Sequence, residues 1–182
     1  MTDAPRLPLV DPGTAPEEIR GILEAWPLGL HRTIAHNPET LSRWMVFAEH
    51  ILRGNSLPER DREIVILRVA WNTRSRYEWG MHGRLARRIG MTDADLGAIV
   101  EGPETASLPV HERALIRAVD EIQQDWKITD ATWHELAARY TPAQLIDLIF
   151  VTGQFMLVAV TLNSLNIPME QQEGLEPFPA PR

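Results

Sequence analysis

The chain has 182 residues, a length that fits one domain with a substantial hydrophobic core. Its net charge of -7 argues against nucleic acid as the main partner, and the absence of cysteine excludes disulfides, thiolate metal sites and thiol redox chemistry. The N-terminus lacks the apolar core of a signal peptide, so we expect a cytoplasmic protein with no membrane partner.

The N-terminal residues 1–16 contain four prolines, which predict an extended arm that lies on a surface and ends in a turn. A short helix is expected after this arm, and Pro27 and Gly29 should end it. At the other end, residues 168–182 are rich in proline and predict an irregular tail. Residues 1–182 are expected to form a single domain, with these two segments as its N-terminal arm and its C-terminal tail.

Capping residues and apolar periodicity predict an all-α fold for that domain. Asn37 before Pro38 is typical of a helix start, Thr141 begins a capping box, and Gly90 is typical of a helix end. We expect a bundle of about six to eight helices. They should cover approximately residues 17–26, 38–53, 58–72, 74–89, 92–101, 109–122, 130–139 and 142–165.

The last predicted helix, residues 142–165, is rich in large apolar side chains and is long enough to cross a membrane. Asp147, Gln154 and Asn163 interrupt it, however, and no basic anchor flanks it. We therefore interpret it as a core or subunit-interface helix. Its apolar surface and the proline-rich arms exceed what one small domain can bury, which predicts a homo-oligomer.

The segment from Arg62 to His82 is the centre of the sequence pattern. Ile64 to Trp71 is almost wholly apolar and much too short to span a membrane, so it belongs to an element that is buried on nearly all sides. Periodicity alone would also allow a core strand. The flanking residues favour a helix, because Ser56 fits a capping box with Pro58 at the first helical position.

The second half of this segment carries Ser75, Glu78 and His82, spaced three and four residues apart and therefore on one face of a helix. Glu63 enters at the start of the preceding buried helix, where a lone carboxylate is costly unless it is paired. We predict that Glu63 meets Glu78 and His82 across the two packed helices. Such a cluster would be a carboxylate–imidazole proton-transfer site.

This pattern resembles the carboxymuconolactone decarboxylase family, which shares its helical fold with the alkylhydroperoxidase-D-like (AhpD-like) proteins. The resemblance rests on Leu-Pro-x-x-x-Arg-Glu ending at Glu63, an apolar run, Tyr-Glu-Trp-x-x-His ending at His82, and then Ala86 and Gly90. The peroxidase branch has a glutamate, a Cys-x-x-Cys pair and a histidine. Glu63 and His82 match the glutamate and the histidine of that motif, and Ser75 and Glu78 occupy the two cysteine positions. This chain therefore resembles the branch without the thiol pair.

The resemblance implies an AhpD-like bundle that assembles as a trimer or hexamer, or sometimes a dimer. It also implies a cofactor-free decarboxylase, or a related lyase or isomerase, acting on a small unsaturated lactone or carboxylic acid. A carboxymuconolactone-type intermediate of aromatic catabolism is the model substrate. His82 would be the general acid/base, Glu78 its partner, and Glu63 a second relay or orienting group.

Several neighbours of this motif are candidates for substrate contact. Tyr77 and Trp79 would form walls, Arg62, Arg74 or Arg76 would receive a substrate carboxylate, and Ser75 would lie on the same face as Glu78. We expect no cofactor and no metal, because the other histidines show no spacing typical of ligands. His36 is the one among them that could lie near a pocket mouth.

Each of these assignments has a structural alternative. Glu78 and His82 could be a solvated helix pair worth only ~0.3–0.5 kcal/mol. Glu63 could satisfy a helix terminus or pair with Arg62 or Arg68, and Trp79 could serve packing alone. The alternative function is a non-enzymatic helical oligomer, or a small-molecule-binding protein, that retains the family fold.

Overall fold

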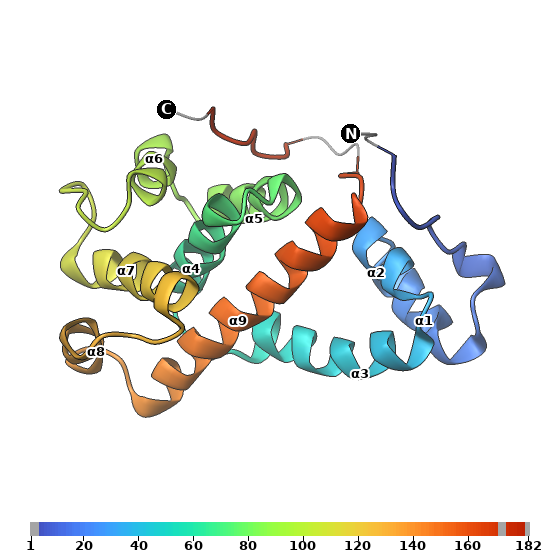
Figure 1. Cartoon of the computed structure of the whole chain (residues 1–182), viewed down its shortest axis with the longest axis horizontal. Helices are drawn as coiled ribbons and strands as arrows, with labels where there is room; N and C mark the ends of the chain where they lie inside the picture. The colour runs from blue at the N-terminus through green and yellow to red at the C-terminus, as the bar shows by residue number, and fades with distance from the viewer. Residues whose placement is uncertain (1–3, 171–173, 181–182) are drawn as a thin grey trace.

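The computed structural model describes residues 4–170 and 174–180, and these residues form helices and connecting segments without a strand (Figure 1). Besides a 3-10 turn at Pro12–Thr14 and a π-helical turn at His50–Gly54, they contain nine α-helices. These are α1 Glu17–Ala25, α2 Gly29–Ile34, α3 Pro38–Glu49, α4 Glu59–Asn72, α5 Arg76–Arg88, α6 Asp93–Glu101, α7 Val110–Asp125, α8 Asp130–Ala137 and α9 Pro142–Leu165.

The all-α prediction is confirmed, and α2 is the helix that the sequence analysis did not predict. Pro27 and Gly29 do end α1, but a new helix begins at Gly29 itself. Its first amide donates to the Glu170 carboxylate from the C-terminal end of the chain. A contact 141 residues away in sequence therefore supports this six-residue helix, and no local pattern could have indicated it.

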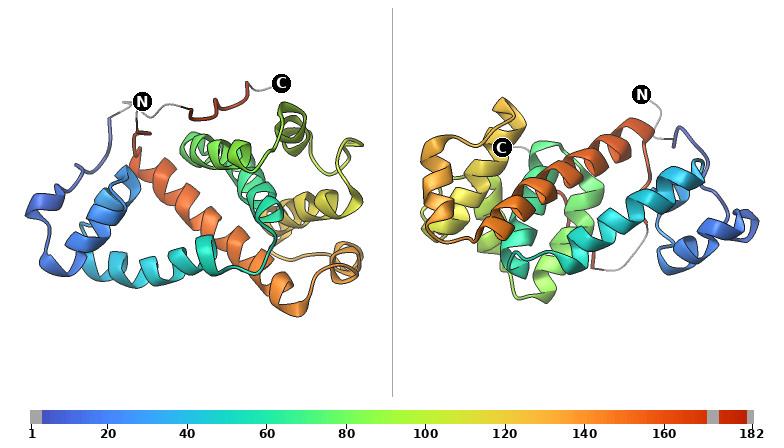
Figure 2. Two further views of the ribbon diagram at one scale, coloured as in Figure 1. Left: turned by 180° about the vertical axis from the view of Figure 1, so that it is seen from behind. Right: turned by 90° about the horizontal axis from the view of Figure 1, so that it is seen from below.

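Helix α4 is the centre of the fold and packs against α5, α7 and α9 (Figures 1 and 2). Every residue from Glu63 to Ala70 is buried, which explains the continuous apolar run in the sequence. The one basic residue in the run, Arg68, donates to Asp120 of α7 at 2.7 and 2.8 Å and to the carbonyl of Ile99 at 2.6 Å. Its charge is thus compensated, as burial of a guanidinium requires.

The start of α4 differs from the prediction. Pro58 is the N-cap residue and Ser56 does not cap the helix. Instead, the Ser56 amide and hydroxyl both donate to the Asp147 carboxylate of α9. Ser56 lies two residues before the N-cap, too far from the first turn to satisfy its free amides, and Asp147 offers it a stronger acceptor. The capping box at Thr141 is confirmed.

Helix α9 crosses the molecule between the α1–α3 end and the α6–α8 end (Figure 1). By length and composition alone it could span a membrane, but half of its most apolar window is buried inside the fold. Its remaining face carries exposed apolar side chains at helical spacing: Ile146, Ile149, Phe150, Leu157 and Val160. One helix therefore serves both the core and a large apolar surface.

The C-terminal residues 174–180 are irregular, as predicted, but they pack closely on α5. Phe178 stacks on Trp71 with ring centroids 5.5 Å apart, and Trp79 donates from its indole to the carbonyl of Pro177 at 3.0 Å. A β-carbon at Gly83 would collide with the Glu176 side chain. The absence of a side chain on that face of α5 therefore allows the tail to dock.

We predict that the exposed stripe of α9 is buried against a second copy of the chain. Val160→Glu should reduce the mass measured by light scattering at micromolar concentration, because a charge in an apolar interface loses its hydration. Val110→Glu on α7 is the matched control, since Val110 and Val160 are both 60% exposed. A wild-type chain that is monomeric, or a control that dissociates equally, would contradict the prediction.

We also predict that docking of the tail contributes to stability. Gly97 in α6 has open space around it, so Gly97→Ala should raise the free energy of unfolding by ~0.5–1 kcal/mol through the usual helical gain. Gly83→Ala should instead lower Tm, because its methyl group displaces the Glu176 segment. Thermal melts followed by circular dichroism, at one fixed protein concentration, give the Tm of both variants. If Gly83→Ala and Gly97→Ala raised Tm equally, docking of the tail would not contribute to stability.

Candidate functional site

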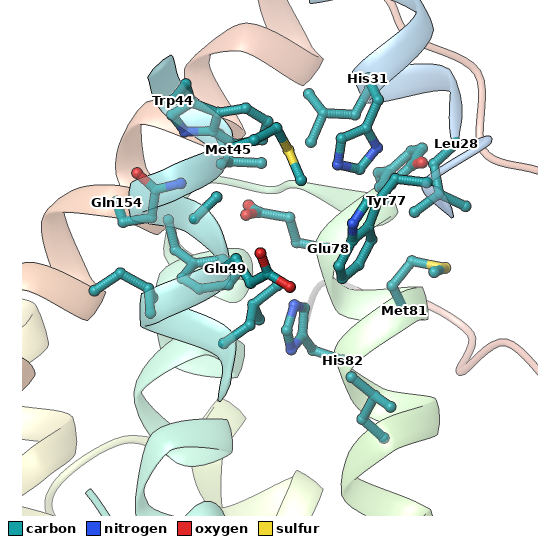
Figure 3. Close-up of a pocket in the computed structure, with 18 residues that line it drawn as sticks. Leu28, His31, Trp44, Met45, Glu49, Tyr77, Glu78, Met81, His82 and Gln154 are labelled. Atoms are coloured by element: carbon teal, nitrogen blue, oxygen red, sulfur yellow. The ribbon is translucent and has the colours of Figure 1, made fainter. Parts of the chain in front are cut away.

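A pocket of about 150 Å³ lies among α2, α3, α5 and α9 (Figure 3). Most of its lining is apolar, from aromatic, leucine, isoleucine and methionine side chains. The polar exceptions are His31, Glu49, Tyr77, Glu78, His82 and Gln154. Polar groups few in number within an apolar cavity are typical of a small-molecule site.

Glu63 and His82 form a hydrogen-bonded pair beside this pocket. Glu63 Oε2 lies 2.8 Å from His82 Nδ1, and the two residues are only 1% and 8% exposed. The other Glu63 oxygen accepts from Arg62 Nη2 at 3.3 Å. Phe155 packs edge-on against the imidazole with ring centroids 4.8 Å apart. The pair is therefore held in one orientation by contacts on both sides.

This geometry fixes which ring nitrogen is available. A carboxylate oxygen accepts, so the Nδ1 of His82 carries the proton that is donated to Glu63. In the neutral ring, Nε2 then carries the lone pair, and His82 lines the pocket. The arrangement can take a proton from a molecule in the pocket and return it, while Glu63 stabilises the charged ring.

Glu78 does not have the role predicted for it as the hydrogen-bond partner of His82. It projects from α5 into the same pocket, but among the described residues neither of its carboxylate oxygens has a hydrogen-bond partner (Figure 3). Burial raises the pKa of Glu78 well above its ordinary value. Ser75 Oγ opposes this shift in part but lies outside hydrogen-bond geometry. Glu78 and His82 are four residues apart and share one face of α5, but the Nδ1 of His82 is already hydrogen-bonded to Glu63.

His31 is a pocket residue that the sequence analysis missed. Its ring lies between Trp26 and Trp44, with centroid distances of 5.6 and 5.8 Å, and its buried Nδ1 has no partner among the described residues. Burial lowers the pKa of His31 to about 4. His36, which was expected near a pocket mouth, instead contacts the carbonyl of Pro8 at 2.9 Å and holds the N-terminal arm.

Of the residues predicted to contact substrate, the structure places Tyr77 at the pocket, where its hydroxyl donates to Glu170 at 2.8 Å. Trp79 faces away from the pocket and packs against Trp71 and the tail. Arg62 does not reach the pocket either, because its guanidinium turns back to Glu63 and Glu59 on its own helix.

The remaining predicted contacts also lie elsewhere. Arg74 and Arg76 line a separate surface depression with Asn163 and Met169. Ser75 is fully buried at the N-cap of α5 and is not part of the pocket wall. The tight turn between α4 and α5, in which Arg74 has a φ of 55°, places these three residues at the start of α5, just before the pocket residues Tyr77 and Glu78.

One group outside the pocket brings possible metal ligands together. Atoms of Asp61, His111 and Glu112 lie within 4.8 Å of one another. Asp61 already accepts from the hydroxyl of Tyr140, and Glu112 is held by Arg60 through two hydrogen bonds. Because both carboxylates have protein partners, we assign this group to the packing of α4 against α7.

The burial of Glu78 predicts a pH-dependent effect of Glu78→Gln on stability. Below the ordinary glutamate pKa of 4.5, both folded and unfolded chains hold the proton, and the substitution should change Tm little. As the pH rises above that value, only the unfolded chain releases the proton, so the wild type loses stability relative to the variant. The loss is about 1.4 kcal/mol per pH unit until the folded-state pKa is passed. Glu104→Gln, at an exposed loop position, is the control. If the difference in Tm between the wild type and Glu78→Gln stayed constant from pH 4 to 8, the conclusion that Glu78 is buried without a partner would be refuted.

Comparison with solved structures shows that the fold is shared with AhpD-like proteins. An uncharacterised peroxidase-related protein with an alkylhydroperoxidase AhpD core, from Ralstonia eutropha, superposes with a TM-score of 0.78 at 16% identity, over 92% of this chain and 93% of that one. An uncharacterised peroxidase-related protein from a Silicibacter species gives 0.79 at 18% identity, over 98% and 97%. A search of curated proteins gave no match.

The sequence comparison covers the region that builds the site. Residues 38–121 match the carboxymuconolactone decarboxylase family, and this region includes α3, α4 and α5. Glu63, Glu78 and His82 all lie within it. The chain is thus similar to the carboxymuconolactone decarboxylase family over residues 38–121, and its helical fold is similar to that of AhpD-like proteins over nearly its whole length.

Proposed function

We propose that the protein is a cofactor-free enzyme of the cytoplasm that transfers a proton on a small unsaturated lactone or carboxylic acid. The overall reaction would be a decarboxylation or a related isomerisation. The observation that carries this proposal is the Glu63–His82 pair, which is buried, oriented through Nδ1 and placed at the wall of an apolar pocket.

The proposed chemistry needs only one proton carrier and a place for negative charge. In a decarboxylation, the bond to the carboxylate carbon breaks, carbon dioxide leaves and its electron pair moves into the conjugated carbonyl. Protonated His82 then gives its Nε2 proton to the carbon that has gained the electron pair. In an isomerisation, neutral His82 first removes a proton from carbon and later returns it. Glu63 stabilises the charged ring in both cases.

The structural neighbours are named peroxidase-related, but this chain does not have the atoms for thiol-based peroxide reduction. It contains no cysteine, and Ser75 and Glu78 occupy the positions that resemble the cysteine pair. A hydroxyl and a carboxyl group cannot form the disulfide that such a reaction leaves behind. What the chain shares with those neighbours is the fold, which does not by itself specify a reaction.

The test follows exchange of carbon-bound hydrogen for deuterium, by NMR in heavy water, across a panel of small unsaturated lactones and acids. This readout detects proton transfer before any product is known. His82→Gln should lower the exchange rate ~10²–10⁴-fold. Glu63→Gln should be of similar severity, because its amide can turn its N–H group toward Nδ1 and favour the wrong tautomer.

His134→Gln is the matched control. His134 is exposed on α8, and its Nδ1 contacts the carbonyl of Asp130. This variant should retain the wild-type rate. If the wild type catalysed no exchange and released no carbon dioxide with any member of the panel, the enzymatic proposal would fall. The protein would then be assigned to binding without catalysis.

A further inference from the structure

The pocket contains two buried polar groups that the Glu63–His82 pair does not use. Glu78 on α5 and His31 on α2 both line it, and Figure 3 shows both side chains directed toward the cavity. Both oxygens of Glu78 and the Nδ1 of His31 lack hydrogen-bond partners among the described residues. An unpaired buried polar group costs about 1–3 kcal/mol, so its retention calls for an explanation. A polar ligand that pairs with these groups supplies one.

The charge of the pocket restricts that ligand. Among the described residues that line it, none is lysine or arginine. Arg53, which lies over the Trp26 ring at 4.8 Å, is already paired with Glu49 at the edge of the pocket. Burial favours the neutral forms of both Glu78 and His31. An anionic ligand would lose its hydration here without gaining a counter-charge at this end of the cavity.

The size of the pocket restricts the ligand further. Its volume of about 150 Å³ is that of an apolar cavity able to hold one benzene ring. The tryptophans around His31 and the ring of Phe155 offer flat apolar contacts to such a molecule. A ring bearing two carboxylates would fit poorly in both volume and charge.

We propose, as a refinement that rests on the proposed function, that the pocket selects an uncharged, ring-sized carbonyl compound such as an unsaturated lactone or cyclic enone. Glu78, in its carboxylic acid form, donates a hydrogen bond to the carbonyl oxygen of this ligand. His31 supplies a second neutral polar contact and adds no charge. Acids of the carboxymuconolactone type are selected against.

With such a substrate the reaction is a double-bond shift in which all atoms balance. His82 Nε2 removes a proton from carbon, the electron pair of that C–H bond moves through the double bond to the carbonyl oxygen, and the Glu78 hydroxyl stabilises the oxygen. The same proton then returns to the other end of the conjugated system. The product is an isomer of the substrate, and no oxidant or reductant takes part.

The test compares two probes on the full-length protein by calorimetry at pH 7. α-Angelica lactone is the uncharged ring, and furoate is a ring of similar size that bears a carboxylate. The lactone should bind at least about tenfold more tightly. Glu78→Gln keeps a neutral donor and should retain lactone affinity within about threefold, whereas Glu78→Ala should lose about tenfold.

A second variant tests charge selection without touching Glu78. Met81 is half-buried at the pocket, so Met81→Lys can place an ammonium group there while its stem remains packed. Met81→Lys should therefore bind furoate more tightly than the lactone. Met156→Lys, half-buried and away from this pocket, should leave the preference unchanged. Circular dichroism confirms that each variant is folded.

The outcomes separate this inference from the proposed function. Tight lactone binding, with reversal in Met81→Lys, supports the assigned ligand class, and the deuterium exchange of the same lactone then judges catalysis independently. Lactone binding without exchange would overturn the enzymatic proposal and leave the ligand class standing. Furoate binding as tight as that of the lactone, or no binding of either probe, would overturn the inference.

Discussion

The buried carboxylate of Glu63 is the constraint on which the rest of the site depends. It lies in a helix enclosed by three others, where an unpaired charge would be very costly. Arg62 and His82 together satisfy both of its oxygens. Removal of one partner of a buried charged pair typically costs ~3–5 kcal/mol, so the register of α5 against α4 is tied to this contact. The same contact orients the only imidazole of α5.

Helix α5 connects that pair with the C-terminal segment. One face of α5 directs Glu78 and His82 toward the pocket. The opposite face has glycines at positions 80 and 83, and the C-terminal segment packs on it. Glu170 links the two regions, since it accepts from Tyr77 on α5 and from the first amide of α2. The tail thereby helps to position α2, which contributes His31 to the pocket. The shape of the pocket consequently depends in part on the contacts of Glu170 with α2 and α5.

The site also illustrates how one set of positions can support different chemistry. With cysteines at positions 75 and 78, the resemblance would point to a thiol reaction. Ser75 is instead buried as the N-cap of α5, and Glu78 is directed into the cavity without a partner. Carboxyl groups in different surroundings take different roles: Glu63 is paired with a cation and an imidazole, whereas burial favours the neutral form of Glu78.

The sequence alone determined those features that depend on local pattern. Helical spacing and caps such as Thr141 predicted most of the helices, because these signals act within one turn. The continuous apolar run predicted that α4 would be enclosed, and the costly position of Glu63 predicted that it would meet α5. The motif around Tyr77 and His82 indicated the resemblance to the family whose pattern residues 38–121 match.

Only the tertiary structure decided which groups actually meet. Glu63 of the preceding helix, and not Glu78 of the same helix, binds Nδ1 of His82 at 2.8 Å, and neither oxygen of Glu78 forms a hydrogen bond among the described residues. His31 enters the pocket through α2, a helix whose first amide donates to Glu170 from the other end of the chain. The arginines near the motif face neighbouring carboxylates or the outer surface. Contacts across such long sequence separations leave no periodic signal, so they appear only when the chain is folded.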